Sequence, residues 1–190
     1  MKLLEERIKK DGIVLDDNVL KVGGFLNHQI DPMLMKDMAV EWHELYKDCK
    51  VDKILTIEAS GIAMATMVAY EFGVPLLFAK KSKTTNIGNE VYSTMVQSFT
   101  HGVTNNVQVE KKFLSKDENV LIIDDFLAKG EALKGLIDLC DQAGAHVVGC
   151  GIAVEKAFQP GGDMLRQKGI RIESLARIKS MNSQNSIEFC

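Results

Sequence analysis

The most regular pattern of apolar and polar positions follows an aspartate–proline pair. Apolar residues then return at every third or fourth position, the spacing that places them on one face of a helix. This pattern predicts a helix over 32–47. Asp31 suits its N-cap, and Pro32 suits the first helical position because its fixed φ matches the helix. The residues of the apolar face are Leu34, Met38, Trp42 and Leu45.

Two later stretches each predict a strand, a helix and a second strand in succession. The first has a strand at 53–59, a helix over 61–72 ended by Gly73 and a strand at 75–79; the second has a strand from 119, a helix that ends at Gly144 and a strand at 146–154. Because each helix crosses over between its strands, we expect the strands to be parallel. The run 120–123 is apolar at every position, which is typical of a strand buried on both faces.

The rest of the chain adds shorter elements. These are a helix over 2–10, apolar runs at 13–15 and 19–22 with a break at Gly23-Gly24, a turn at 161–162, a helix near 163–168 and a strand near 171–178. Residues 82–112 are polar, and we interpret them as a flexible hood with a hairpin of 91–99 and 107–113. The predicted fold is α/β: one domain over 1–190 with a mostly parallel open sheet flanked by helices, a hood and a small N-terminal segment.

The composition and net charge of the chain limit the kinds of molecule that it is expected to bind. A chain of 190 residues is long enough for one domain with its own core. A net charge of −3 offers no general attraction for nucleic acid or an anionic membrane, so we expect neither partner. No apolar run approaches the roughly 20 residues of a membrane span, and MKLLEERIKKDG lacks the apolar segment of a signal peptide. The four cysteines form no CxxC pair, which favours a reducing, cytoplasmic setting.

Two adjacent carboxylates, Asp124 and Asp125, follow the buried run directly. In parallel α/β sheets, ligands bind beyond the carboxyl ends of the strands. Carboxylates in that place can accept hydrogen bonds from the diol of a ligand, or organise Mg²⁺ directly or through water. The alternative is that the pair only caps a strand-to-helix turn, and the two residues alone leave both interpretations open.

The loop after this pair has the composition of a phosphate site. Its small residues let backbone N–H groups approach an anion, and the dipole of the following helix favours negative charge. The loop and the acids together describe a site for a ribose 5-phosphate. The common GxxxxGK[ST] and GxGxxG motifs are absent, and no histidine has a partner at metal-ligand spacing. The residues of the loop are Ala128, Lys129, Gly130, Glu131 and Ala132.

The segment VLIIDDFLAKGEALKG resembles the signature of type I phosphoribosyltransferases. The resemblance implies that Asp124 and Asp125 are catalytic residues that hold the ribose, and that 128–132 binds phosphoribosyl pyrophosphate. It further implies a basic segment with Lys81 that leads into the hood. The expected pyrophosphate loop comprises Glu58, Ala59, Ser60 and Gly61.

The run LKVGGFLNHQIDP at 20–32 resembles the purine-recognition segment of bacterial xanthine phosphoribosyltransferases. The resemblance implies xanthine contacts from Leu20, Asn27 and Lys156, with Mg²⁺ as the cofactor and a homodimer as the assembly. The implied reaction moves the phosphoribosyl group to N9 of xanthine. A carboxamide such as that of Asn27 offers both a donor and an acceptor to a purine edge, and the Lys156 cation suits a base with acidic ring protons.

The loop departs from the broader family signature at three positions. Related enzymes commonly carry hydroxyls where Lys129 and Ala132 stand, so the backbone amides here must contribute more. Glu131 places an acid where an anion binds, and we expect its carboxylate to point outward. Two alternatives stay open: the same chemistry with hypoxanthine or guanine, and a regulator that senses phosphoribosyl pyrophosphate without catalysis. Too few residues precede the first core strand for the DNA-binding module of such a regulator.

Overall fold

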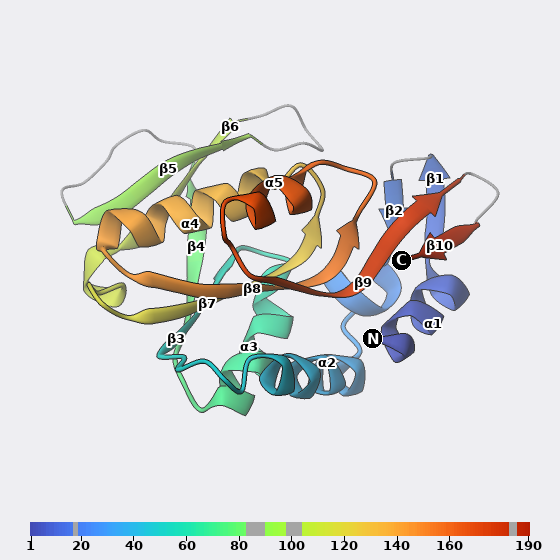
Figure 1. Ribbon diagram of the computed structural model, residues 1–190, viewed down its shortest axis with the longest axis horizontal. Helices are drawn as coiled ribbons and strands as arrows, with labels where there is room; N and C mark the ends of the chain where they lie inside the picture. The colour runs from blue at the N-terminus through green and yellow to red at the C-terminus, as the bar shows by residue number, and fades with distance from the viewer. Residues whose placement is uncertain (17–18, 83–89, 98–103, 183–185) are drawn as a thin grey trace.

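A computed structural model describes residues 1–16, 19–82, 90–97, 104–182 and 186–190 (Figure 1). The helices are α1 (Lys2–Asp11), the π-helix η1 (Gly23–Asn27), α2 (Pro32–Leu45), α3 (Gly61–Phe72), the 3₁₀-helix η2 (Lys111–Phe113), α4 (Glu131–Ala143) and α5 (Gly161–Gln167). The strands are β1 (Ile13–Asp16), β2 (Val19–Lys21), β3 (Lys53–Ile57), β4 (Leu76–Ser82), β5 (Val91–Gln97), β6 (Thr104–Glu110), β7 (Asn119–Leu127), β8 (His146–Lys156), β9 (Ile172–Met181) and β10 (Ile187–Phe189).

The central sheet has the order β10-β9-β8-β7-β3-β4-β6-β5. The five strands from β9 to β4 in this order are parallel, whereas β10, β6 and β5 pair antiparallel at the two edges. The prediction of a mostly parallel α/β sheet is therefore confirmed. Helices α2 and α3 lie on one face of the sheet, and α4 and α5 lie on the other (Figure 1).

Strand β7 is buried on both faces, as its apolar run predicts. Leu121 and Ile123 belong to the core on the α2 and α3 side, and Val120 and Ile122 belong to the core beneath α4. All four side chains are fully buried. Because side chains alternate between the faces of a strand, a continuous apolar run serves both cores at once.

The predicted helix boundaries have clear physical causes. The Asp31 side chain accepts hydrogen bonds from the backbone N–H groups of Met33 and Leu34, so it caps α2. Helices α3 and α4 end at Gly73 and Gly144, with φ of 66° and 73°. Glycine adopts this left-handed conformation without a steric penalty.

The hairpin expected within 82–112 is present, with strands β5 and β6 in place of 91–99 and 107–113. It is not separate from the core: β6 pairs with β4, and the hairpin continues the sheet. Val96, Val107 and Val109 are buried in the core that includes α4. Polar and apolar residues alternate along these strands, which is typical of a hairpin with one buried face. The high overall content of polar residues in 82–112 hid this alternation. Closure of the hood remains a prediction, because residues 83–89 and 98–103 lie outside the described chain.

Three local expectations were wrong. Gly23-Gly24 does not simply break the chain but begins η1, and Gly161-Gly162 is not a turn but the start of α5. The acid pair does not close its strand, because β7 continues to Leu127. The short edge strand β10 gave no clear pattern and was not predicted.

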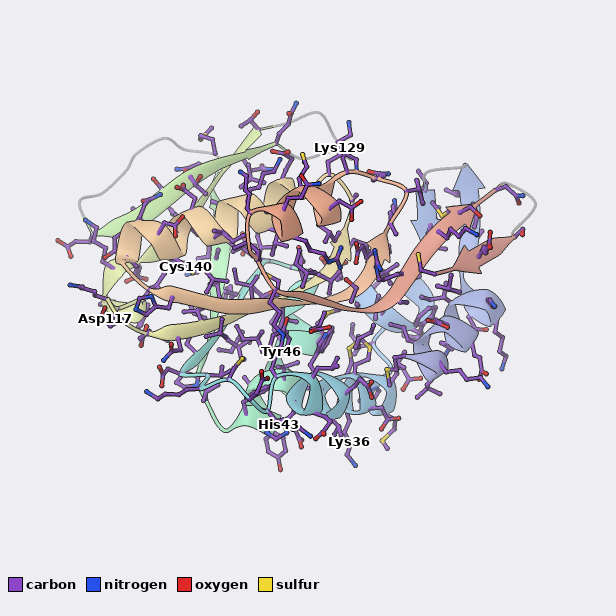
Figure 2. All side chains as sticks on the ribbon, in the orientation of Figure 1. Lys36, His43, Tyr46, Asp117, Lys129 and Cys140 are labelled. Carbon is purple, nitrogen blue, oxygen red and sulfur yellow. The ribbon has the colours of Figure 1, made fainter. Side chains whose placement is uncertain are left out.

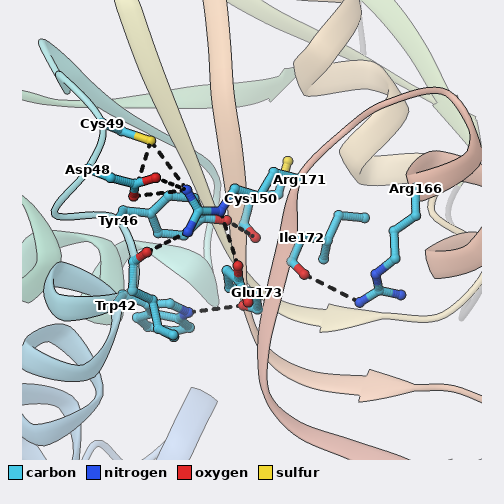
Figure 3. A network of polar contacts seen from close by, with 10 residues as sticks. Trp42, Tyr46, Asp48, Cys49, Cys150, Arg166, Arg171, Ile172 and Glu173 are labelled. Carbon is cyan, nitrogen blue, oxygen red and sulfur yellow. Dashed lines mark hydrogen bonds and ion pairs between the residues drawn. The ribbon is translucent and has the colours of Figure 1, made fainter.

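A polar network joins the end of α2 to β8 and β9 (Figure 3). The Arg171 guanidinium donates to Asp48, Glu173 and the Leu45 carbonyl, and its Cζ lies 4.6 Å from the centroid of the Tyr46 ring. The Tyr46 hydroxyl donates to the Cys150 carbonyl at 3.0 Å. Burial raises the pKa of this hydroxyl, so it stays protonated as the donor.

The Tyr46 ring fills the space beside Gly149. A Cβ at residue 149 would lie 2.4 Å from Cε1 of that buried ring. We therefore expect Gly149→Ala to lower the free energy of unfolding by about 1–3 kcal/mol, the usual cost of overpacking a core. Gly24→Ala is the control, because a Cβ there meets no atom within 4 Å. Urea denaturation of both variants checks the prediction, and equal stabilities would contradict it.

Candidate functional site

A cavity of about 910 Å³ opens at the carboxyl ends of β3, β7 and β8. It brings together residues that lie far apart in the sequence. Those that the sequence singled out are Leu20, Asn27, Ser60, Lys81, Asp124, Asp125, Ala128, Lys129, Gly130, Glu131, Ala132 and Lys156. The cavity is therefore the place where the predicted site residues converge.

The two carboxylates lie in the last part of β7, with exposed fractions of only 4% for Asp124 and 9% for Asp125. Asp124 Oδ1 accepts from the backbone N–H of Asp125 at 3.0 Å. Asp125 Oδ1 accepts from the backbone N–H of Phe126 at 3.0 Å, and its Oδ2 accepts from Asn27 Nδ2 at 2.9 Å. Hydrogen bonds thus hold both carboxylates in defined orientations at the floor of the cavity.

Burial is the main reason why the pKa of Asp124 is raised well above its ordinary value, and the negative charge of Asp125 adds to the shift. Both effects disfavour a second charge in the pair. Helix α3 approaches closely here, because a Cβ at Gly61 would lie 2.1 Å from Thr56 Oγ1 and 3.6 Å from Asp124 Oδ1. The environment of Asp124 therefore favours the neutral form of its carboxyl group more than water does.

The loop between β7 and α4 is shaped by glycine at two places. Gly130 has a φ of 82°, which L side chains rarely adopt. Gly161, at the start of α5, donates its N–H to the Ala128 carbonyl at 3.1 Å, and a Cβ on it would lie 2.4 Å from that oxygen. Helix α5 therefore supports the loop from behind. The N-cap residue of α4 is Gly130, which has no side chain to bond the first N–H groups of the helix, so the loop and the first turn can present them to an anion.

The charged side chains of this loop lie at its rim. Glu131 Oε1 accepts from Lys134 Nζ at 2.8 Å, so its carboxylate is held along the surface of α4. Both side chains are 38% exposed. Lys129 is exposed and lies at an outer edge of the molecule (Figure 2). Both Lys129 and Glu131 also line the cavity, so the outward direction of the Glu131 carboxylate remains a prediction.

Another part of the cavity is formed by the N-terminal segment and the end of β8. Leu20 lies on β2, and Asn27 is the last residue of η1. Lys156 ends β8, and its Nζ lies 5.6 Å from the centroid of the Phe126 ring. Partial burial lowers the pKa of Lys156. Phe126 and Phe158 also line the cavity, so it combines aromatic surface with an amide and an amine.

The expected pyrophosphate loop is only partly in the cavity. Ser60 and Lys81 line it, whereas Glu58, Ala59 and Gly61 do not. The Glu58 carboxylate accepts from the backbone N–H of Lys81 at 2.5 Å, so it ties this loop to β4. Ala59 is exposed, and Gly61 begins α3.

Sequence reasoning missed several lining residues. Phe126 stands directly after the acid pair and Phe158 two residues after Lys156, so their proximity to predicted residues was the available signal. The sequence gave no sign that the hairpin lines the cavity, because this depends on how β5 and β6 join the central sheet. Its lining residues are Val96, Gln97, Asn105 and Val107.

Within the described residues, no group of three or more His, Cys, Asp or Glu side chains could hold a metal ion. Asp124 and Asp125 offer at most a partial ligand set. Mg²⁺ is commonly bound by one or two carboxylates together with substrate phosphates and water. The acid pair fits that mode and does not form a cage for a permanently bound ion. The helices of the described residues include none long and apolar enough to cross a membrane.

Comparisons with known proteins agree on one family. Residues 23–169 match the family model of the phosphoribosyl transferase domain. The xanthine phosphoribosyltransferase of Lactobacillus delbrueckii subsp. bulgaricus is 57% identical over 179 residues, which cover 94% of this chain and 95% of the relative. The protein of the same name from Finegoldia magna is 52% identical over 187 residues, or 98% of both chains.

Among solved structures, the adenine phosphoribosyltransferase of Giardia lamblia in complex with 9-deazaadenine matches with a TM-score of 0.77 and 22% identity. The match covers 92% of this chain and 97% of that one. The Trypanosoma brucei adenine phosphoribosyltransferase matches with a TM-score of 0.76 and 19% identity, over 92% and 79% of the two chains. At these identities the likeness shows the shared fold alone.

The raised pKa of Asp124 gives a testable titration. We expect the carboxyl of Asp124 to titrate above its ordinary pKa of 3.8, and Asp125→Asn to lower the Asp124 pKa because the neighbouring charge is removed. Burial remains in the variant, so the pKa should fall only part of the way. Carboxyl ¹³C shifts followed by NMR against pH measure both values. An Asp124 pKa at its ordinary value, or one unmoved by the substitution, would contradict this account.

Proposed function

The chain belongs to the phosphoribosyl transferase family, and from this membership we propose that it is a purine salvage enzyme that makes xanthosine 5′-monophosphate. It transfers the 5-phosphoribosyl group from phosphoribosyl pyrophosphate to N9 of xanthine and releases pyrophosphate. The observation that carries the proposal is the convergence of the acid pair, the glycine-shaped loop, Asn27 and Lys156 in one cavity. Relatives at 51–57% identity over nearly the whole chain are named xanthine phosphoribosyltransferases.

We assign the ribose and its 5-phosphate to the acid pair and the loop. Asp125 and Asp124 accept hydrogen bonds from the ribose diol, for which their lone pairs at the cavity floor are suited. Backbone N–H groups of 128–132 bind the 5-phosphate, and the positive end of the α4 dipole favours its charge. Ala132 has no hydroxyl with which to bind the phosphate. The backbone N–H groups must therefore approach the phosphate closely, and the left-handed conformation of Gly130 allows this.

We assign the purine to the part of the cavity between Leu20, Asn27 and Lys156. Leu20 and Phe126 supply apolar surface for the faces of the base, and the Asn27 carboxamide hydrogen-bonds to its edge. Xanthine has an oxo group at C2 and acidic ring protons. A cation such as Lys156 favours the negative charge that the base develops as a ring proton leaves.

The reaction forms a bond from N9 to the anomeric carbon as the bond from that carbon to the pyrophosphate oxygen breaks. The bonding pair leaves with pyrophosphate, and the base releases one proton. Positive charge develops on the ribose and negative charge on the leaving group. The site therefore acts by positioning and electrostatics, with no covalent nucleophile. Ser60 and Lys81, which line the cavity, bind the leaving pyrophosphate.

Mg²⁺ is the proposed cofactor, bound together with phosphoribosyl pyrophosphate. Asp124 and Asp125 would hold it directly or through water, with the remaining ligands supplied by the substrate. Held there, the ion would supply positive charge that neutralises part of the charge on the pyrophosphate group. We further propose, from the family resemblance, a cytoplasmic homodimer without nucleic-acid or membrane partners.

The choice of base is the first test. We expect the highest kcat/KM with xanthine among the common purines, because Lys156 favours a base that gives up a ring proton readily. Absorbance assays with phosphoribosyl pyrophosphate, Mg²⁺ and each base in turn measure it. Equal or better use of hypoxanthine or guanine would favour the broader 6-oxopurine alternative. Ligand binding with no turnover of any base would favour a regulator.

The phosphate loop gives a second test. Gly130→Val should raise the KM for phosphoribosyl pyrophosphate severely, because a β-branched residue at a φ of 82° strains the loop. Glu131→Gln is the matched neighbour, and its effect should stay within about threefold, since an exposed ion pair such as that with Lys134 contributes little. Steady-state kinetics with saturating base compare the two. A large effect of Glu131→Gln beside a silent Gly130→Val would place the phosphate elsewhere.

A further inference from the structure

Asn27 reaches from the N-terminal segment to the carboxylate at the centre of the sheet. Its Nδ2 donates to Asp125 Oδ2 at 2.9 Å, across 98 positions of sequence. The proposed function places Asn27 on the base and Asp125 on the ribose. The hydrogen bond therefore links two parts of the cavity that would bind different portions of the reacting molecules.

The segment that carries Asn27 is firmly anchored. Phe25 and Leu26 of η1 are fully buried in the core. The backbone N–H of His28 donates to the Gly23 carbonyl and closes the π-helical turn, and the N–H of Gln29 donates to the same oxygen at 2.7 Å. Arg7 donates to Asp31 at 2.8 Å, and its Cζ lies 5.0 Å from the centroid of the Phe25 ring. Asn27 therefore projects from a fixed support and not from a loose loop.

The hydrogen bonds of Asp125 define its orientation. One carboxylate oxygen accepts from the Phe126 backbone N–H, and the other accepts from Asn27. The backbone bond alone leaves the carboxylate free to turn about its terminal torsion, which is broad in aspartate. Two donors on different oxygens fix that torsion. Each oxygen can accept more than one hydrogen bond, so capacity for a diol remains.

We propose that Asn27 is a positioning residue for Asp125, in addition to any contact that it makes with the base. Its amide holds the carboxylate in the orientation that receives the ribose hydroxyls of phosphoribosyl pyrophosphate. The inference rests on the proposed function, because it takes Asp125 to be a ribose ligand. Its distinctive consequence is that loss of the Asn27 amide weakens phosphoribosyl pyrophosphate binding when no base is present.

A double-mutant cycle tests this role. The affinity for phosphoribosyl pyrophosphate with Mg²⁺ and without base is measured by calorimetry for wild type, Asn27→Ala, Asp125→Ala and the double variant. Asn27→Ala should weaken binding about tenfold, the effect of one hydrogen bond to a charged group. In the Asp125→Ala background the same change should have an effect within about threefold, because the group that it positions is gone.

A control and an isosteric variant sharpen the result. Gly24→Ala alters η1 without touching Asp125 or the cavity, since a Cβ there meets no atom within 4 Å, and should leave this affinity unchanged. Asn27→Leu keeps a similar shape without the amide donor. It should weaken binding about tenfold in the wild-type background and by less than about threefold in the Asp125→Ala background. This variant also carries the test if Asn27→Ala does not fold, as judged by thermal unfolding.

The possible results distinguish a failure of the positioning role of Asn27 from a failure of the proposed role of Asp125 as a ribose ligand. Wild-type affinity in Asn27→Ala and Asn27→Leu, or an equal loss in both backgrounds of the cycle, would overturn the positioning role. Unchanged affinity in Asp125→Ala would instead show that Asp125 is not a ribose ligand, and the proposed assignment of the acid pair would fail first.

Discussion

The site depends on keeping two neighbouring carboxylates at the end of a strand that is buried on both faces. Charge is costly in such a place unless hydrogen bonds or a shared proton compensate for it. Here the backbone N–H groups of Asp125 and Phe126 and the Asn27 amide provide the compensation, and Asp124 has a raised pKa. The surrounding fold is organised to hold this arrangement. It places β7 centrally in the sheet, brings the first turn of α3 close to Asp124 and anchors η1 against Asp125.

A second buried charge shows how the fold supports the loop beside this pair. Glu155 on β8 is 1% exposed, and it accepts two hydrogen bonds from Arg166 of α5, at 2.6 and 2.7 Å. Ser174 and Arg177 of β9 also donate to it. These donors outweigh its burial and lower the pKa of Glu155, so it remains charged. The ion pair fixes α5 to the sheet, and α5 in turn carries Gly161 behind the loop.

The parts of the protein that sequence predicted best are those with local causes. The run 120–123, the capping Asp31 and the terminal Gly73 and Gly144 each act within a few residues, and the structure has them as predicted. The acid pair and the loop followed from the same local pattern. The pairing of the hairpin with β4, the π-helical turn and the Asn27–Asp125 bond depend on packing between distant segments. No local periodicity encodes such contacts, so they became visible only in three dimensions.

The contact between Gly161 and the loop has a consequence for how this site can vary. A Cβ at 161 would occupy the space of the Ala128 carbonyl and the Lys129 backbone, and a Cβ at Gly130 would lie 3.4 Å from the Gly161 Cα. The backbone of each segment therefore limits the conformations that the other segment can adopt. A library that randomises residues 128–130 but keeps Gly161 therefore varies the side chains of the loop while its backbone conformation stays the same. New shapes of the loop require changes in both segments together.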